Sequence, residues 1–89
     1  MSELEKTLEE RGSVYGDFRD QATIAQQLKD TMRKFEGWDD MGPHHKEALD
    51  MIQHKVARLI NGDPNHQDSW HDIGGYAKCV EDRLPKQDT

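Results

Sequence analysis

Residues 47–60, EALDMIQHKVARLI, decide the fold because they carry two different faces when placed on a helix. Their apolar side chains recur at spacings of three and four, which is the signature of one helix face. Pro43 suits a helix start, and Asn61-Gly62 suits a helix end. The stretch therefore predicts a helix from Pro43 to about Ile60, with an apolar stripe made of Leu49, Ile52, Val56, Leu59 and Ile60.

Two further amphipathic helices flank this stretch in the sequence. The first is expected from about Asp17 to Phe35, and the second from Asp68 or Ser69 to just before Pro85, with Ser69 and Asp72 as a possible capping box. The first stripe consists of Phe18, Ala22, Ala25, Leu28, Met32 and Phe35. The second stripe consists of Trp70, Ile73, Ala77, Val80 and Leu84.

The N-terminal residues 2–11, SELEKTLEER, predict a weakly amphipathic helix that Ser2 and Glu5 begin and Gly12 stops. Short connections between amphipathic helices indicate antiparallel neighbours. We therefore expect an all-α fold: a small antiparallel bundle of three long helices plus a short N-terminal helix. The chain reads as a single domain over residues 1–89, with an N-terminal arm (1–12), a bundle core (13–84) and a tail (85–89).

The composition restricts the class of protein further. Leu, Ile, Val and Phe make up only about 17% of the 89 residues, and the formal net charge is −6. Such a thin core predicts a homo-oligomer in which a second copy supplies the missing apolar contacts. The acidic balance makes direct DNA binding unfavourable. The sequence has no long apolar run and no signal peptide, and its single cysteine cannot form an internal disulfide; together these features indicate a cytoplasmic protein without a membrane span.

The second face of the 47–60 helix carries the candidate chemistry. Glu47 and Asp50 are three apart and could share Mg²⁺, a cation that prefers oxygen ligands. His54 and Arg58 follow at one-turn intervals, and Lys55 lies beside them, where cations would meet a phosphate. The alternative is a solvated face held by ion pairs between successive turns.

The last predicted helix adds a second polar face. Asp68 and Asp72 lie one turn apart, and Gly75 continues the same side. Gly74 and Gly75 each weaken a helix interior by about 1 kcal/mol relative to alanine. Their presence predicts the close approach of a ligand or of a partner helix, the alternative being a purely structural packing seam.

Three aromatic residues are candidates for stacking on a nucleotide base: Tyr15, Trp70 and Tyr76. Tyr15 lies in the connection RGSVYGDF (residues 11–18), where it could instead plug one end of the bundle. The five histidines show no zinc-binding spacing.

The two stretches RGSVYGDF (11–18) and EALDMIQHKVARLINGDPNHQDSWHDIGGYAKCVEDRL (47–84) resemble a family of short, uncharacterised bacteriophage and prophage proteins. More distantly, the pattern is similar to the MazG-like all-α nucleoside triphosphate pyrophosphohydrolases and to phage nucleotide-modification-associated domains. That resemblance implies that Glu47 and Asp50 form one acidic pair and that Asp72 ends the second. Ser69 stands where the second pair has a glutamate, and Asp68 is the available substitute.

Two functions follow as hypotheses. The first is a phage-encoded protein of the infected bacterial cytoplasm with a MazG-like face that binds nucleotide phosphates, acting as an active or vestigial pyrophosphohydrolase. Its metal ligands for Mg²⁺ would be Glu47, Asp50, Asp68 and Asp72, and its nucleotide contacts would be His54, Lys55, Arg58, Tyr15, Trp70 and Tyr76. The second is a non-enzymatic interaction protein that binds and inhibits or redirects a host defence or replication factor. A structural alternative also stays open, in which the protein forms a stable oligomer that serves as a scaffold.

Overall fold

The computed structural model describes residues 2–85, and every regular element within them is an α-helix. Five helices follow one another: α1 (Glu3–Tyr15), α2 (Phe18–Arg33), α3 (Glu36–Asp39), α4 (Pro43–Asn61) and α5 (Gln67–Glu81). The prediction of an all-α fold with three long helices and an N-terminal helix is confirmed. Of the expected C-terminal tail, only its first residue lies within the described part of the chain.

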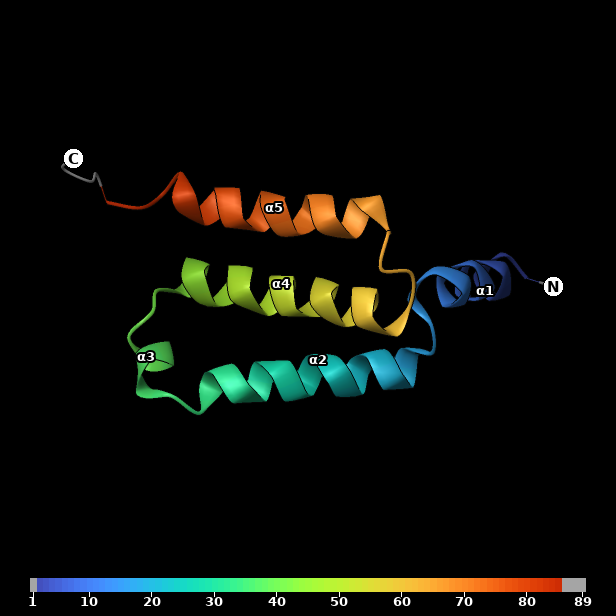
Figure 1. The fold of residues 1–89 in the computed structure, drawn as a ribbon, viewed down its shortest axis with the longest axis horizontal. Coiled ribbons are helices and arrows are strands. Elements are labelled where there is room, and N and C mark those ends of the chain that lie inside the picture. Colours follow the sequence, from blue (N-terminus) through green and yellow to red (C-terminus); the bar gives the residue numbers. More distant parts are fainter. Residues whose placement is uncertain (1, 86–89) are drawn as a thin grey trace.

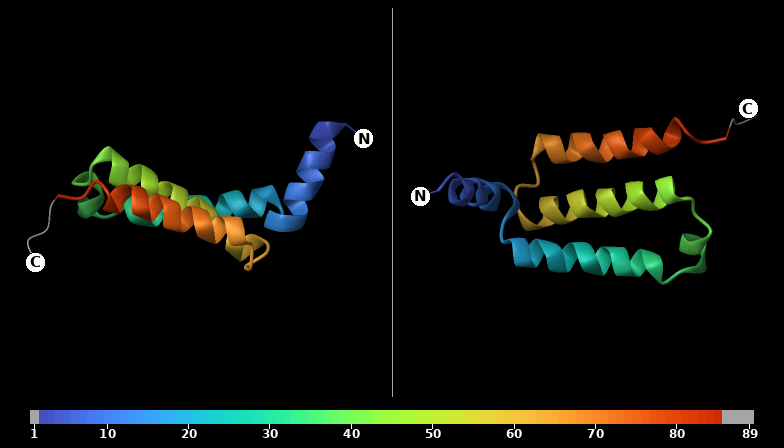
Figure 2. Two further views of the ribbon diagram at one scale, coloured as in Figure 1. Left: turned by 90° about the horizontal axis from the view of Figure 1, so that it is seen from above. Right: turned by 180° about the vertical axis from the view of Figure 1, so that it is seen from behind.

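The three long helices lie side by side and antiparallel, with α4 in the middle (Figure 1). Viewed from above, they form a single layer, and α1 leaves the layer at an angle on one side (Figure 2). The central helix packs against α2 along one flank and against α5 along the other. This arrangement leaves the layer with two broad faces, and α4 contributes to both.

Ion pairs and small side chains mark the two flanks of α4. Arg33 of α2 faces Asp50 at 3.5 Å, whereas Lys55 reaches Asp72 of α5 at 3.0 Å. The buried apolar side chains are mainly alanines, namely Ala25, Ala48 and Ala57, together with Leu59. Small residues at these positions let neighbouring helix axes approach closely. Small side chains therefore fill most of the contacts between neighbouring helices. Most of the large apolar side chains are not buried in these contacts.

The expected end of the first helix was wrong. Gly12 does not stop the helix, which continues to Tyr15 and ends at Gly16, where φ is +78°. A glycine in a helix interior costs stability but does not break the hydrogen-bond ladder. Positive φ is the stronger stop signal because residues with a Cβ rarely adopt it. The predicted start is confirmed, since Ser2 Oγ accepts a hydrogen bond from the backbone N–H of Glu5 at 3.1 Å.

Two other boundaries differ by a few residues. The helix α2 ends at Arg33, and the short helix α3 follows it before the turn to Pro43. At the other end of the molecule, α5 begins at Gln67 rather than at Asp68 or Ser69. His66 is the N-cap, and its Nδ1 accepts a hydrogen bond from the Ser69 backbone N–H at 3.3 Å. The expected capping role of Ser69 is therefore filled by a histidine, a residue type outside the usual N-cap set.

Several side chains that the apolar stripes assigned to the core are exposed instead. The residues in question are Phe18, Phe35, Ile60, Trp70, Ala77 and Leu84. Periodicity identifies the apolar side of a helix but does not say what covers that side. In a single layer, the side of each helix that turns away from its neighbours is left open to solvent.

None of the helices within residues 2–85 combines the length and the apolar character that crossing a lipid bilayer requires.

Candidate functional site

A cavity of about 500 Å³ opens where α1, α2 and α4 meet. It lies at the end of the layer from which α1 departs (Figure 2). This volume is in the range of pockets that hold small organic ligands. Its lining residues are Leu8, Arg11, Gly12, Tyr15, Gly16, Asp17, Phe18, Gln21, His54 and Arg58.

Hydrogen bonds join the turn between α1 and α2 to the turn after α4, and they position the walls of the cavity. We call this pair of bonded turns the clasp. The side-chain amide of Asn61, the last residue of α4, donates to the backbone oxygens of Tyr15 (3.0 Å) and Asp17 (2.7 Å). The backbone N–H of Asp63 donates to the Val14 oxygen at 2.7 Å. These bonds tie the α1–α2 turn to the end of α4.

Glycine is required at both sides of this clasp. A Cβ on Gly62 would lie 2.1 Å from the Val14 oxygen and 2.5 Å from the Tyr15 Cα. Gly16 combines its positive φ with an equally close approach to the backbone of Asn61. Close backbone approach is a structural use of glycine that no side chain can replace. The neighbouring Asp17 caps α2, because its Oδ1 accepts from the backbone N–H groups of Arg19 (2.8 Å) and Asp20 (3.2 Å).

Arg58 and Tyr15 form the polar centre of the cavity. The guanidinium carbon of Arg58 lies 4.4 Å from the centroid of the Tyr15 ring, which is cation–π distance. The ring of His66 meets Tyr15 edge-on at 5.3 Å. The Arg58 Nε is buried and has no hydrogen-bond acceptor among the described residues. A buried guanidinium N–H without an acceptor is costly, so a ligand that brings an anionic oxygen would satisfy it.

His54 lies one turn before Arg58, and both burial and nearby positive charges affect the pKa of its imidazole. Burial lowers the pKa of its imidazole, and the nearby cations Arg58, Lys29 and Lys55 lower it further. Repulsion of a second positive charge is the physical cause of this latter effect. Arg11 and Arg58 line the cavity beside His54, so cationic side chains gather at this site although the chain as a whole is acidic.

The four acidic residues expected to hold Mg²⁺ do not come together at one point in the structure. Asp50 and Asp72 each face a cation from a neighbouring helix, at 3.5 Å and 3.0 Å respectively. Lys55 lowers the pKa of Asp72, chiefly through its hydrogen bond to the carboxylate. Among residues 2–85, no three His, Cys, Asp or Glu side chains gather into a group that could hold a metal ion. The donor set of one copy therefore does not fit a magnesium centre, and the role of Mg²⁺ stays a prediction.

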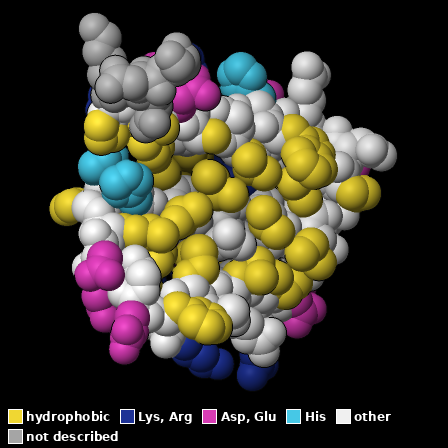
Figure 3. Space-filling view, turned by 60° about the vertical axis from the view of Figure 1, so that its left-hand side comes forward, with side chains coloured by type: hydrophobic (Ala, Val, Ile, Leu, Met, Phe, Trp, Pro, Cys, Tyr) yellow, Lys and Arg dark blue, Asp and Glu magenta, His cyan; other side chains and the backbone are white. Residues whose placement is uncertain are grey.

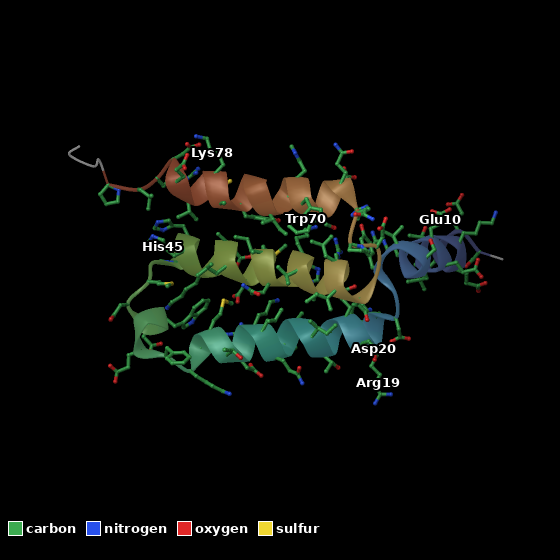
Figure 4. All side chains as sticks on the ribbon, viewed as in Figure 1. Glu10, Arg19, Asp20, His45, Trp70 and Lys78 are labelled. Atoms are coloured by element: carbon green, nitrogen blue, oxygen red, sulfur yellow. The ribbon has the colours of Figure 1, made fainter. Side chains whose placement is uncertain are left out.

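The structure separates the six expected nucleotide contacts into two groups. Tyr15, His54 and Arg58 line the cavity together. Lys55 is committed to Asp72, with only 12% of its side chain exposed. The remaining two aromatic residues lie away from the cavity. Trp70 is on α5 and donates its indole N–H to the Pro64 oxygen at 2.8 Å (Figure 4).

Tyr76 lies in a second, smaller hollow between the start of α4 and the end of α5. This hollow has a volume of about 220 Å³ and also contains Glu47. Its other lining residues are His44, Ala48, Cys79, Val80 and Arg83. Glu47 and Tyr76 are therefore neighbours, but they lie at the opposite end of the layer from Tyr15 and Arg58.

Ser69, the residue at the expected glutamate position, has a structural role. It is only 1% exposed, and its hydroxyl lies 2.8 Å from the His66 Nδ1. Asp68 is exposed on the same helix. A glutamate at position 69 would bury a carboxylate against the cap of α5, where it would need a partner.

Sequence reasoning did not assign most of the cavity lining to a site, and Arg11, Phe18 and Gln21 are among the residues that it missed. Arg11 was missed because the first helix was predicted to end at Gly12. A helix that ends there does not place Arg11 and Tyr15 on one face. A continuous helix brings residues three and four apart to the same side. Leu8, Arg11 and Tyr15 have that spacing, so the signal was present in the sequence.

No curated protein and no solved structure matches the chain significantly. A family described as a domain of unknown function, DUF6378, matches residues 1–84. This match covers nearly the whole chain, including every helix that builds the cavity. The protein therefore belongs to the DUF6378 family of domains of unknown function.

Proposed function

We propose that this protein binds the phosphate of a nucleotide in the cavity between α1, α2 and α4. The observation that carries the proposal is that Arg58 lines a cavity of about 500 Å³, while its Nε is buried without an acceptor among the described residues. Arg11 and His54 add cationic or donor groups to the same walls. A phosphate oxygen is the acceptor that suits a guanidinium best.

The remainder of the cavity suits the rest of a nucleotide. Tyr15 and Phe18 offer aromatic surfaces, and Gln21 offers an amide that can donate and accept hydrogen bonds. Aromatic side chains stack on bases of any sequence, because every base has a π-face. One carboxylate, that of Asp17, lies in the lining, and it is engaged in capping α2.

Isothermal titration calorimetry tests this proposal with inorganic phosphate, nucleoside monophosphates and nucleoside triphosphates, each with and without Mg²⁺. We expect saturable binding, stronger for nucleotides than for phosphate alone. Arg58→Gln is expected to weaken binding at least tenfold, whereas the matched Arg19→Gln change, on an exposed arginine of α2, should leave it unchanged. The proposal would be wrong if no nucleotide bound, or if Arg58→Gln bound nucleotides as tightly as the wild type.

Hydrolysis is a separate and stronger proposal, which rests on the resemblance to MazG-like enzymes. It assigns Glu47, Asp50, Asp68 and Asp72 to Mg²⁺, although one copy of the chain does not gather these side chains into a metal site within residues 2–85. A pyrophosphate-release assay on wild-type protein and on Glu47→Ala distinguishes the two proposals. Binding without release of pyrophosphate supports a site that binds but does not hydrolyse. Phage origin, action in the host cytoplasm and homo-oligomerisation likewise remain proposals.

The second candidate function, an interaction protein that acts on a host factor, is favoured by α1. This helix has no buried residue, and it projects from the layer (Figure 2). Its exposed surface carries Glu3, Glu5, Glu9 and Glu10 beside Leu4 and Leu8. Such a surface would favour a basic partner. Loss of a captured host protein on Glu5→Lys and Glu9→Lys, with nucleotide binding retained, would support this candidate.

A further inference from the structure

One broad face of the helix layer is apolar, and none of its side chains is fully buried. We call this surface the apolar face. Helix geometry places its residues on the same side of α2, α4 and α5, away from the cavity. They are Ile24, Leu28, Leu49, Ile52, Val56, Ile60, Trp70, Ile73 and Ala77, and each is half-buried or exposed.

The figures show the extent of this surface. Hydrophobic atoms form a continuous field over the face in the space-filling view (Figure 3). Ile60 is 64% exposed and Trp70 is 57% exposed, although both are large apolar side chains on helices. A groove of about 260 Å³ runs between α4 and α5, with Leu49, Ile52 and Ala77 among its lining residues. An apolar surface of this size on a chain this small indicates an interaction site.

The accessible area of the chain supports the same conclusion quantitatively. The chain exposes 6845 Å². A compact monomer of 10.3 kDa is expected to expose only about 5,400 Å². The excess of about 1,400 Å² is larger than the ~800 Å² that each partner buries in a standard stable interface. The chain as a whole, including the projecting helix α1, therefore has enough uncovered surface for a full protein–protein interface.

We infer that a second copy of this chain covers the apolar face, so that two helix layers stack face to face around a two-fold axis. In the space-filling view, the Asp, Glu, Lys and Arg side chains lie around the edge of the hydrophobic surface (Figure 3), so two copies can meet although each has a net charge of −6. An interface made of the same patch on both copies is the commonest form of homodimer. The buried apolar side chains of one copy are few, and a chain with so small a core can depend on a second copy for its stability.

This assembly leaves the nucleotide cavity accessible. His54 and Arg58 lie on the side of α4 opposite Leu49, Val56 and Ile60, and α1 departs on that same opposite side (Figure 2). The inference therefore does not depend on the proposed function, and each can fail without the other.

Sedimentation equilibrium of the full chain tests the inference, without any ligand. We expect a mass of twice 10.3 kDa for the wild type and a denaturation midpoint that rises with protein concentration. Ile60→Glu is expected to halve the mass and retain the helical circular dichroism signal, because this side chain is already exposed in one copy. Phe18→Glu, a change of an exposed aromatic on the cavity side, is the matched control and should keep the dimer.

Three outcomes overturn the inference. One is a helical wild-type monomer whose denaturation midpoint does not change with concentration. Another is a dimer that Phe18→Glu dissociates and Ile60→Glu does not, since this would place the interface on the other face. The third is a mass above two copies. If Ile60→Glu is unfolded, the concentration dependence of the wild-type midpoint still decides between a monomer and a dimer.

Discussion

Lys55 of α4 places its Nζ 3.0 Å from the Asp72 Oδ2 of α5, and this ion pair spans the seam between the two helices. The lysine is largely buried, while the carboxylate is more accessible. Both residues were expected to face a ligand, one as a phosphate contact and the other as a metal ligand. In the structure, each satisfies the other.

The first prediction concerns the pH dependence of this pair. The hydrogen bond from Lys55 lowers the pKa of Asp72 in the folded chain. A lowered folded pKa means that the pair stabilises the fold above the unfolded pKa of about 3.9, and that this stabilisation is lost as pH falls through the folded pKa. Asp72→Asn should therefore lower the urea midpoint at pH 7, and its difference from wild type should shrink towards pH 3. Asp68→Asn is the control, and a difference that stays constant with pH would contradict the prediction.

The second prediction concerns His54 as a reporter of anion binding. Burial and three nearby cations lower the pKa of its imidazole in the free protein. A phosphate in the cavity adds negative charge, so it should raise this pKa. By linkage, phosphate should bind more tightly as pH falls through the range in which His54 gains its proton. NMR titration of the His54 ring, with and without phosphate, measures the effect, and the ring signals of the exposed His71 provide the control.

A third prediction follows from the histidine cap of α5. The His66 Nδ1 accepts a hydrogen bond from the Ser69 backbone N–H at 3.3 Å, and the Ser69 hydroxyl lies 2.8 Å away. His66→Ala removes the acceptor and should lower the free energy of unfolding by about 1 kcal/mol. His66→Asn restores an N-cap side chain and should recover most of that loss. Chemical denaturation measures both, with His71→Ala as a control that is expected to have little effect.

The fourth prediction compares two glycines. A Cβ on Gly62 would collide with the backbone at Val14 and Tyr15, whereas a Cβ on Gly12 would meet nothing within 4 Å. Gly62→Ala should therefore destabilise the fold by about 2 kcal/mol or more, because backbone atoms must move. Gly12→Ala should instead stabilise α1 by about 0.5–1 kcal/mol. Thermal melts of the two variants should shift in opposite directions, and equal shifts would refute the role given to the clasp.

The fifth prediction addresses the two adjacent glycines of α5. A Cβ on Gly74 or on Gly75 meets nothing within 4 Å in one copy of the chain. The packing explanation within one chain therefore does not apply, and Gly75→Ala should stabilise the helix by about 1 kcal/mol. If a ligand or a partner helix approaches this glycine closely, Gly75→Leu should damage that approach. If Gly75→Leu is as stable as Gly75→Ala, and still binds nucleotide and forms the dimer, then neither a ligand nor a partner helix approaches this glycine closely.

The sequence predicted the helices well because their signals are local. Apolar periodicity, the Ser2 cap and Pro43 each act within one or two turns, and each corresponds to an observed feature. The wrong boundary at Gly12 arose because glycine weakens a helix without ending it. The true end depends on a positive φ at Gly16. Gly16 also lies against the backbone of Asn61, far along the chain, and local sequence does not reveal that contact.

The candidate site was only partly predictable, for a different reason. The polar faces of α4 and α5 were read correctly as distinct from their apolar stripes. Which polar residues meet, however, depends on how the helices are arranged. A closed bundle with converging acids would gather Asp50 and Asp72 around an ion, whereas the layer pairs each of them with a cation on its own seam. The cavity at Arg58 needs α1, whose position no periodic pattern reveals.

The clasp at Asn61 has a consequence for how the protein can be assayed. Its side chain joins the end of α4 to Tyr15, 46 positions earlier in the chain, so no short segment can form the cavity by itself. Only the fully folded chain presents Tyr15 and Arg58 together, and a compound that binds there must shift the folding equilibrium towards the native state. A thermal-shift screen of nucleotides and other phosphate compounds can therefore identify the ligand of this family without any knowledge of a reaction.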